Sequence, residues 1–143
     1  MKERPDNVLE LRARALRLLA RREHSRAELA EKIAPHAESS DAVGSIVETL
    51  LQKKQLSEER YAEERARQLS RKYGAAKIRQ DLKSKGVPEE IIDRIPVEDE
   101  SAKAKAILER KYREPAVTRE ERARRMRFLQ SRGFSIDVIR KIV

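Results

Sequence analysis

The sequence predicts an all-α fold in which three tandem three-helix repeats form an elongated, curved helical array. Three observations predict it. Apolar residues recur at intervals of three and four along the 143 residues, as on one face of a helix, and no strand-like alternation is present. The 4 Gly and 5 Pro stand mostly between these segments, where helices end. Similar segments recur after 45–49 residues, which indicates repeats.

The first repeat is predicted at residues 8–55. Its helices are expected over 6–22, from a capping box at Ser25–Glu28 to Pro35, and over 40–54. In a capping box each of the two side chains accepts a hydrogen bond from the other residue's backbone N–H. The apolar residues that mark the three helices are Val8, Leu11, Ala15, Leu18, Leu19, Leu29, Ile33, Val43, Ile46, Val47, Leu50 and Leu51.

The second repeat is predicted at residues 56–96. Its first helix begins after the N-cap Ser57 and is broken by Gly74. A short helix over 75–85 follows and closes at Gly86, because glycine adopts the left-handed conformation at little cost. A third helix comes after it. The apolar residues that mark these helices are Ala62, Ala66, Leu69, Tyr73, Ile78, Leu82, Ile91, Ile92 and Ile95.

The third repeat is predicted at residues 97–143. A helix is expected over 99–113, and a second capping box at Thr118–Glu121 opens a helix that runs to Gly133. Ser135 caps the last helix. The prediction is therefore nine helices in three sets of three.

The repeats also correspond in sequence. Residues 84–95 align with 131–142 at an offset of 47, and residues 46–50 align with 91–95 at an offset of 45. An insertion near 35–40 accounts for the longer first repeat. Repeat arrays of this kind offer long, shallow contact surfaces rather than deep pockets.

The composition excludes several classes of protein. Charged residues make up 41% and aromatic residues 3% of a chain without cysteine, so disulfides and thiolate metal sites are excluded. Disorder is the competing interpretation of so charged a chain, and the regular helical spacing argues against it. No apolar run approaches the roughly 18–20 residues that span a bilayer, and none follows Met1 as a secretory signal. We expect a cytoplasmic protein, not bound to membranes.

No catalytic constellation is visible. His24 and His36 are the only histidines, and neither has a nucleophile or a ligand set at suitable spacing. His24 precedes a capping serine, which favours a structural role. There is no glycine-rich phosphate loop. The sequence therefore predicts a protein that binds another macromolecule, without enzymatic activity, cofactor or metal.

Basic stripes are the candidate contact residues. The net charge is +9, and residues 99–143 alone carry 13 basic and 7 acidic residues, a net charge of +6, which favours a polyanionic or acidic partner. Arg67 and Arg71 are four residues apart on one predicted helix, and so are Arg79 and Lys83 on the next. Like charges at this spacing repel each other. An outside partner is one explanation of these pairs, and an ordinary solvated helix face is the other. Phe128 is either a core residue or a partner anchor. The candidates are Arg67, Arg71, Lys77, Arg79, Lys83, Arg124, Arg125 and Arg127.

Several segments resemble the RecX family. Leu56–Glu63 is similar to its Leu-Asp-Asp-Glu-Arg-Phe-Ala stretch, and Lys72–Val87 is similar to its Gly-Pro-x-x-Ile-x-x-Glu-Leu-x-x-Lys-Gly-Ile segment. Phe128–Ser135 resembles the signature of the third repeat. The chain departs from the family pattern at Gln55, where many members have an aromatic residue, and at Ala75, where proline is usual.

The resemblance implies a bacterial regulator that takes part in DNA repair, recombination and the SOS response. Such a protein binds the RecA–DNA filament and inhibits its recombinase, ATPase and coprotease activities. A monomer is expected, and direct contact with single- or double-stranded DNA is a further expectation. The alternative function is a basic helical protein that binds DNA without regard to sequence and has no dedicated protein partner. No helix carries the grouped Asn, Gln and Arg that base reading would require.

Overall fold

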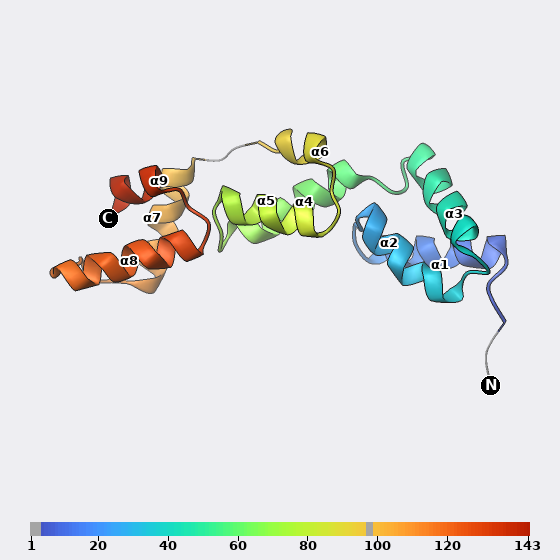
Figure 1. Cartoon of the computed structure of the whole chain (residues 1–143), viewed down its shortest axis with the longest axis horizontal. Helices are drawn as coiled ribbons and strands as arrows, with labels where there is room; N and C mark the ends of the chain where they lie inside the picture. Colours follow the sequence, from blue (N-terminus) through green and yellow to red (C-terminus); the bar gives the residue numbers. More distant parts are fainter. Residues whose placement is uncertain (1–3, 97–98) are drawn as a thin grey trace. The chain divides into compact units, whose positions relative to one another are not determined.

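The computed structural model describes residues 4–96 and 99–143. Across these ranges its regular structure is entirely helical, which confirms the predicted all-α class (Figure 1). Three sets of three α-helices follow one another in the described chain. Their bounds are α1 Val8–Arg21, α2 Arg26–Ile33, α3 Ser40–Gln52, α4 Glu58–Ser70, α5 Ala75–Ser84, α6 Glu89–Asp93, α7 Glu100–Lys111, α8 Arg119–Ser131 and α9 Ile136–Ile142, with a 3-10 turn η1, Ala34–His36, after α2.

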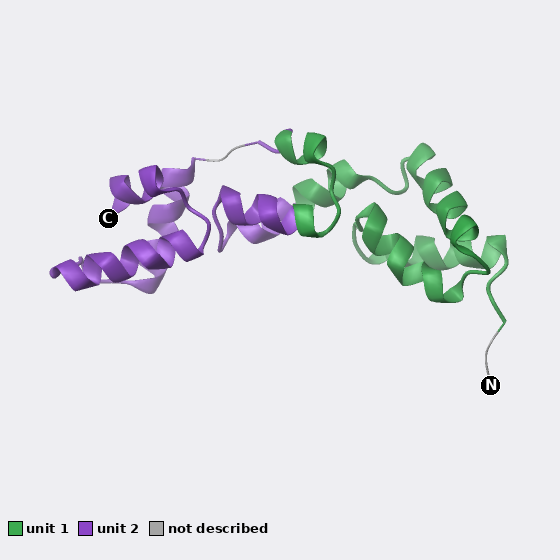
Figure 2. Cartoon of the chain, viewed as in Figure 1, with its two compact units in different colours: residues 1–64, 83–93 green, residues 65–82, 94–143 purple. Residues whose placement is uncertain are grey.

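The chain forms two compact units (Figure 2). The N-terminal unit comprises residues 1–64 and 83–93, and the C-terminal unit comprises residues 65–82 and 94–143. The predicted middle repeat thus contributes residues to both units, since the boundaries fall within α4 and α5. These compact units do not follow the repeat boundaries that the sequence suggests.

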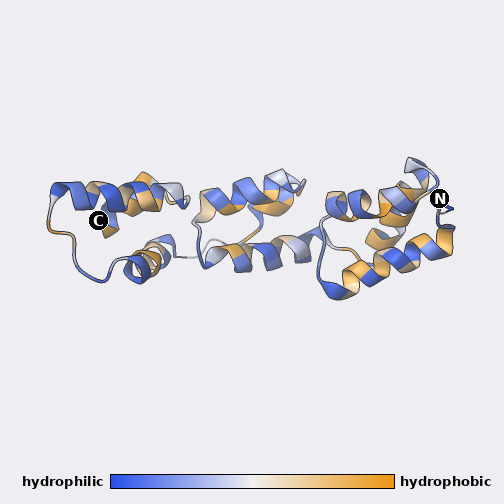
Figure 3. Cartoon of the chain, turned by 90° about the horizontal axis from the view of Figure 1, so that it is seen from below, coloured by the Kyte–Doolittle hydropathy of each residue, from blue (hydrophilic) through white to orange (hydrophobic). Residues whose placement is uncertain are grey.

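The core of the N-terminal unit lies between α1, α2 and α3, which all contact one another. The apolar residues are spaced so that each helix presents one stripe inward. Figure 3 shows hydrophobic and hydrophilic bands along the helices. Burying each large aliphatic side chain contributes roughly 1.5–3 kcal/mol. Val8 belongs to the sequence pattern but is 68% exposed. The most deeply buried large apolar residues are Leu11, Leu29, Ile33, Leu50 and Leu56.

The predicted capping boxes are found in part. Thr118 and Glu121 form a complete box at the start of α8, as expected. Ser25 accepts a hydrogen bond from the Glu28 N–H, but the reciprocal half is missing because the Glu28 carboxylate binds Arg22 at 2.7 Å. A further complete box, formed with Asn7 as N-cap, opens α1 and was not predicted.

The core of the C-terminal unit is built by α7, α8 and α9. Phe128 packs against it, and its ring meets that of Tyr112 edge to face at 6.0 Å between centroids. This confirms the core interpretation of Phe128, with Tyr112 as a ring partner. The buried residues of the cluster are Ala104, Ile107, Leu108, Leu129, Phe134 and Ile139.

Glycines occupy the predicted left-handed positions after α5 and α8. Gly86 has φ +81° and Gly133 has φ +92°, as the capping argument requires. Gly74 is required for a different reason, because it lies against the Gly133 segment. A Cβ atom on Gly74 would lie 2.6 Å from the carbonyl oxygen of Gly133. The Gly74 N–H donates to the Arg132 carbonyl at 2.6 Å, which joins the start of α5 to the end of α8.

Candidate interaction site

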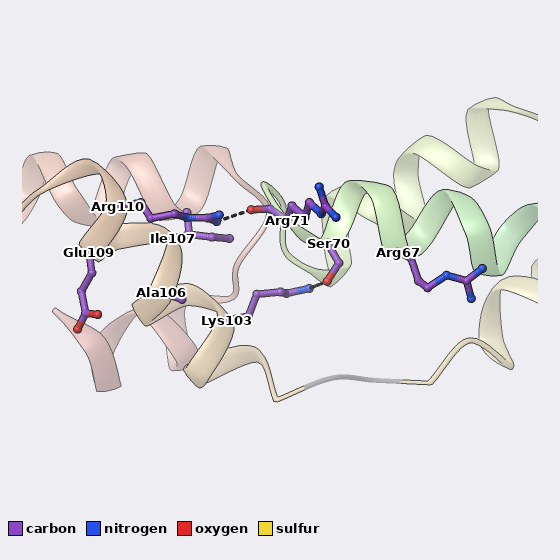
Figure 4. Close-up of a pocket in the computed structure, with 8 residues that line it drawn as sticks. All are labelled: Arg67, Ser70, Arg71, Lys103, Ala106, Ile107, Glu109 and Arg110. Carbon is purple, nitrogen blue, oxygen red and sulfur yellow. Dashed lines mark hydrogen bonds between the residues drawn. The ribbon is translucent and has the colours of Figure 1, made fainter.

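A cleft in the C-terminal unit lies between the last turns of α4 and helix α7 (Figure 4). Its volume is about 710 Å³. Four of the residues that line it are cations and one is a carboxylate. The lining residues are Arg67, Ser70, Arg71, Lys103, Ala106, Ile107, Glu109 and Arg110.

Two cations of α7 reach across to the end of α4 (Figure 4). Arg110 Nη2 donates to the carbonyl oxygen of Arg71 at 2.5 Å, and Lys103 Nζ donates to the hydroxyl of Ser70 at 3.3 Å. The two residues are seven apart, so they lie two turns from each other on one face of α7. A guanidinium group has five N–H donors, so Arg110 can still bind an anion while it holds α4.

The charge of Lys103 is partly neutralised within the unit. Its Nζ lies 2.9 Å from Oε2 of Glu100, whose Oε1 accepts a hydrogen bond from the Ala75 N–H at 2.6 Å. Arg71 and Arg110 bring further positive charge to the cleft, which the carboxylate of Glu109 also lines. Cations around a partly apolar floor suit the binding of an anionic group, rather than acid–base chemistry, which needs a titrating group near neutral pH.

A second feature of the C-terminal unit is a row in which cations and aromatic rings alternate, here called the cation–aromatic row. Successive members lie 4.5–5.9 Å apart, measured from the charged group to the ring centroid. The three rings are half-buried. In order along the row, its members are Lys77, Tyr73, Arg132, Phe128, Lys111, Tyr112 and Arg125.

Backbone contacts fix the two arginines of this row. Arg125 Nη2 donates to the carbonyl of Glu114 at 2.7 Å, and Arg132 Nη1 donates to the carbonyl of Lys72 at 3.4 Å. Within the described residues, none of the four cations of the row forms an ion pair with a carboxylate. Contacts with ring faces and carbonyl oxygens hold a cation in place without neutralising it.

The structure distributes the predicted contact residues over several places. Arg67 and Arg71 meet in the cleft, whereas Lys77 and Arg125 belong to the cation–aromatic row. The others are exposed on their helices: Arg79 and Lys83 on α5, Arg124 and Arg127 on α8.

Four further cations join these two features and were not among the predicted residues. Lys103 and Arg110 line the cleft, and Lys111 and Arg132 belong to the row. The seven-residue spacing of Lys103 and Arg110 was a usable signal, because it places both on one helix face. The row has no signal in the sequence, since its members come from segments far apart in the chain.

Several cations of the N-terminal unit pair with carboxylates, for example Arg14 with Asp6 at 2.8 Å and Arg60 with Glu23 at 2.9 Å. The C-terminal unit contains such pairs as well, for example Arg65 with Asp81 at 2.9 Å. His24 is buried, with Nδ1 3.0 Å from the Arg22 carbonyl and Nε2 3.1 Å from Lys32 Nζ. Burial lowers the pKa of His24. Its contacts fit a neutral ring that donates from Nδ1 and accepts at Nε2, which supports the predicted structural role.

No cluster of three or more His, Asp or Glu side chains within residues 4–96 and 99–143 could hold a metal ion. No helix of the described chain is both long enough and apolar enough to cross a membrane.

Three family models match the chain in order. The first, second and third three-helix domains of RecX match residues 12–50, 57–94 and 98–143. Regulatory protein RecX of Ralstonia nicotianae is 40% identical over 142 residues, which cover 97% of this chain and 89% of that protein. Regulatory protein RecX of Leptothrix cholodnii is 41% identical over 138 residues, which cover 94% of this chain and 88% of that protein.

Solved structures share the fold. The crystal structure of RecX from Lactobacillus salivarius matches with a TM-score of 0.81 and 22% identity, over 94% of this chain and 93% of that one. A second crystal structure, of a regulatory protein RecX, matches with a TM-score of 0.76 and 24% identity, over 94% of this chain and 73% of that one.

Proposed function

The chain belongs to the RecX family, and from that premise we propose that it binds the RecA–DNA filament and inhibits its recombinase, ATPase and coprotease activities. The ordered match of all three RecX domains is the observation that carries the proposal. Relatives of this length and identity are named regulatory proteins. In this proposal the chain acts by binding alone, as a cytoplasmic monomer.

The cleft between α4 and α7 supports a role in filament binding. Its three arginines and Lys103 offer donors to carboxylates or phosphates on a partner surface. Charges at the rim of an interface govern association rate and register more than they contribute to affinity. We therefore expect several weak contacts along the chain. The exposed pair Arg79 and Lys83 on α5 is a second candidate contact.

The test is ATP hydrolysis by RecA on single-stranded DNA, titrated with the protein. We expect the parent to inhibit hydrolysis and Arg79→Glu/Lys83→Glu to need a higher concentration, with an unchanged circular-dichroism spectrum. The matched control is Arg17→Glu/Lys53→Glu, which makes the same charge change at exposed residues of α1 and of the turn after α3. No inhibition by the parent would refute the proposed function. Equal inhibition by all three would leave the function intact and remove Arg79 and Lys83 from the contact surface.

The same assay separates the alternative function. A protein that only covers DNA, without a dedicated protein partner, would inhibit an unrelated DNA-dependent ATPase at the same concentrations. We expect inhibition of RecA at concentrations that leave the unrelated enzyme active. Equal inhibition of both enzymes would support the alternative.

A further inference from the structure

Helix α1 carries an apolar stripe on the side that faces away from the core of the N-terminal unit. The members of this α1 stripe are Leu9, Ala13, Leu16 and Ala20. They follow one another at intervals of four, three and four residues, so they lie along one side of the helix. Leu9 is 76% exposed, Ala13 and Ala20 are exposed as well, and Leu16 is half-buried. The core leaves most of this stripe open to solvent.

The first helix of the second repeat has no such stripe. Helix α4 buries Ala62 and Ala66, whose spacing matches that of the buried residues Leu11 and Ala15 of α1 and so aligns the two helices. The residues of α4 that match the stripe in this alignment are Arg60, Glu64, Arg67 and Arg71. All four are charged. The repeat architecture therefore does not require apolar residues at these positions of α1.

The spacing and the sizes of the side chains indicate that a helix covers the stripe. Intervals that alternate between three and four residues are those of the seam along which two helices pack in a coiled coil. Leucine and alanine alternate along the stripe, so the alanines leave room for large side chains of a facing helix. Lipid surfaces are bound through larger apolar faces with Trp, Phe and several Leu, which this narrow stripe does not provide.

The charges of α1 indicate that this helix is acidic. Glu10, the one carboxylate of α1, is already bound by Arg4 at 2.6 Å. Arg12 comes one residue before Ala13 and Arg21 one residue after Ala20, so the two arginines lie on opposite sides of the stripe. Within the described residues, neither arginine pairs with a carboxylate. A second copy of the chain, with a net charge of +9, would bring like charges to this surface.

We propose that the α1 stripe binds an acidic amphipathic helix of a further partner protein. Leucines of that helix fill the spaces at Ala13 and Ala20, and its carboxylates meet Arg12 and Arg21. The inference goes beyond the proposed function and does not depend on it. The stripe lies within the N-terminal unit, and none of its residues is among the candidate filament contacts.

The probe is a labelled synthetic peptide about three heptads long, with leucine and alanine alternating along its seam and glutamate beside the seam. A second peptide has lysine in place of each glutamate. Fluorescence anisotropy with the full chain gives the affinities. The variant is Leu9→Gln/Ala13→Gln, which keeps the net charge and places good helix formers at two exposed positions. The matched control is Ala102→Gln/Val117→Gln, at exposed residues of the C-terminal unit. Circular dichroism and melting temperature establish that all three proteins are folded.

We expect the parent and the control to bind the glutamate peptide equally and to leave the lysine peptide unbound. The stripe variant should bind the glutamate peptide roughly tenfold more weakly or worse, the order expected when one leucine is no longer buried. No binding by the parent would overturn the inference. Equal affinity of the parent and the stripe variant would also overturn it, because attraction to basic surfaces elsewhere would then explain the binding.

Three other occupants of the stripe are separated by further measurements on the same variant. Dimerisation of the parent that the variant loses, in sedimentation equilibrium, would identify a second copy. Binding to phosphatidylglycerol vesicles that the variant loses would identify a lipid surface. Loss of RecA inhibition by the variant would identify the filament. Each of these results would overturn the inference of a further partner. We expect none of them, and a failure of the parent to inhibit RecA would refute the proposed function alone.

Discussion

Glu58 and Glu100 occupy equivalent positions and make equivalent hydrogen bonds at the two junctions between successive repeats. Each is the first residue of the first helix of its repeat, and each carboxylate accepts a hydrogen bond from the first N–H of the second helix of the preceding repeat. Glu58 accepts from Arg26 at 3.1 Å, and Glu100 accepts from Ala75 at 2.6 Å. The first N–H groups of a helix lack partners inside the helix. One carboxylate therefore caps a helix and joins two repeats.

The first prediction concerns the charge on Glu58. Burial raises the pKa of Glu58 above the ordinary value. The folded state therefore binds the proton of the Glu58 carboxyl group more tightly than the unfolded state does. The contribution of Glu58 to stability is present below the unfolded pKa and is lost as pH rises through the folded pKa. Glu58→Gln keeps an acceptor for the Arg26 N–H and removes the charge. We expect the variant to gain stability relative to the parent as pH rises from about 4.5.

Urea unfolding of both proteins across this pH range is the measurement. Glu58→Ala serves as the comparison, because it removes the acceptor and should lose about 1 kcal/mol at neutral pH, as helix caps do. A Glu58→Gln variant as unstable as Glu58→Ala would show that the charge itself, rather than the acceptor, stabilises the junction.

The second prediction uses two glycines. Gly133 has φ +92°, and a Cβ there would lie 2.5 Å from the Lys77 Cβ and 2.7 Å from its backbone nitrogen. Gly133→Ala should therefore cost about 2–4 kcal/mol, the sum of left-handed strain and overpacking. Gly44, in the interior of α3, has nothing within 4 Å of such a Cβ, so Gly44→Ala should gain about 1 kcal/mol from helix propensity. Thermal unfolding would contradict the packing described here if both variants shifted in the same direction.

The third prediction concerns Lys54, a residue other than glycine that has a left-handed φ of 61°. The Gln55 N–H donates to the Leu50 carbonyl and the Lys54 N–H to that of Leu51, the pattern of a Schellman cap. Gly133 takes the same place after α8, with the same pair of bonds. Lys54→Gly should therefore stabilise the protein by about 0.5–1 kcal/mol. A loss of stability on denaturant unfolding would show that the Lys54 side chain contributes more than its backbone strain costs.

The fourth prediction concerns His24. Burial lowers its pKa, and the Lys32 and Arg22 charges lower it further, against opposing contributions from the Arg22 carbonyl and Glu28. In the unfolded state the pKa of His24 is about 6.5, so below that pH the unfolded state binds more protons at His24 than the folded state does. Stability should therefore fall as pH drops through the folded pKa. NMR should show a neutral His24 ring protonated at Nδ1. A His24→Gln variant should lack this part of the pH dependence, and an unchanged profile would exclude His24 as its source.

Local structure could be predicted from the sequence where short-range chemistry determines it. Gly86 and Gly133 end their helices in the left-handed conformation, and Thr118 with Glu121 forms the expected box. The prediction of a box at Ser25 was wrong in its second half, because Arg22 competes for Glu28. A competing partner outside the helix cannot be identified from a capping pattern alone.

The candidate surface could be predicted only in part. Net charge indicated the C-terminal segment, and the pair Arg67 and Arg71 does line a cleft. The other wall, with Lys103 and Arg110, depends on how α7 packs against the end of α4, which helical periodicity does not determine. The cation–aromatic row depends in the same way on the close approach of Gly74 and Gly133, which brings Tyr73 to Arg132.

The most direct test of the central claim is binding of the full chain to RecA filaments assembled on single-stranded DNA with a non-hydrolysable ATP analogue. Labelled protein is titrated with filament, and Arg71→Glu is compared with the equally charged control Arg17→Glu. The Arg71→Glu change keeps the hydrogen bond from Arg110 to the carbonyl of residue 71. We predict saturable binding of the parent and the control, and markedly weaker binding of the cleft variant with an unchanged melting temperature. Absence of parent binding to the filament would contradict the account.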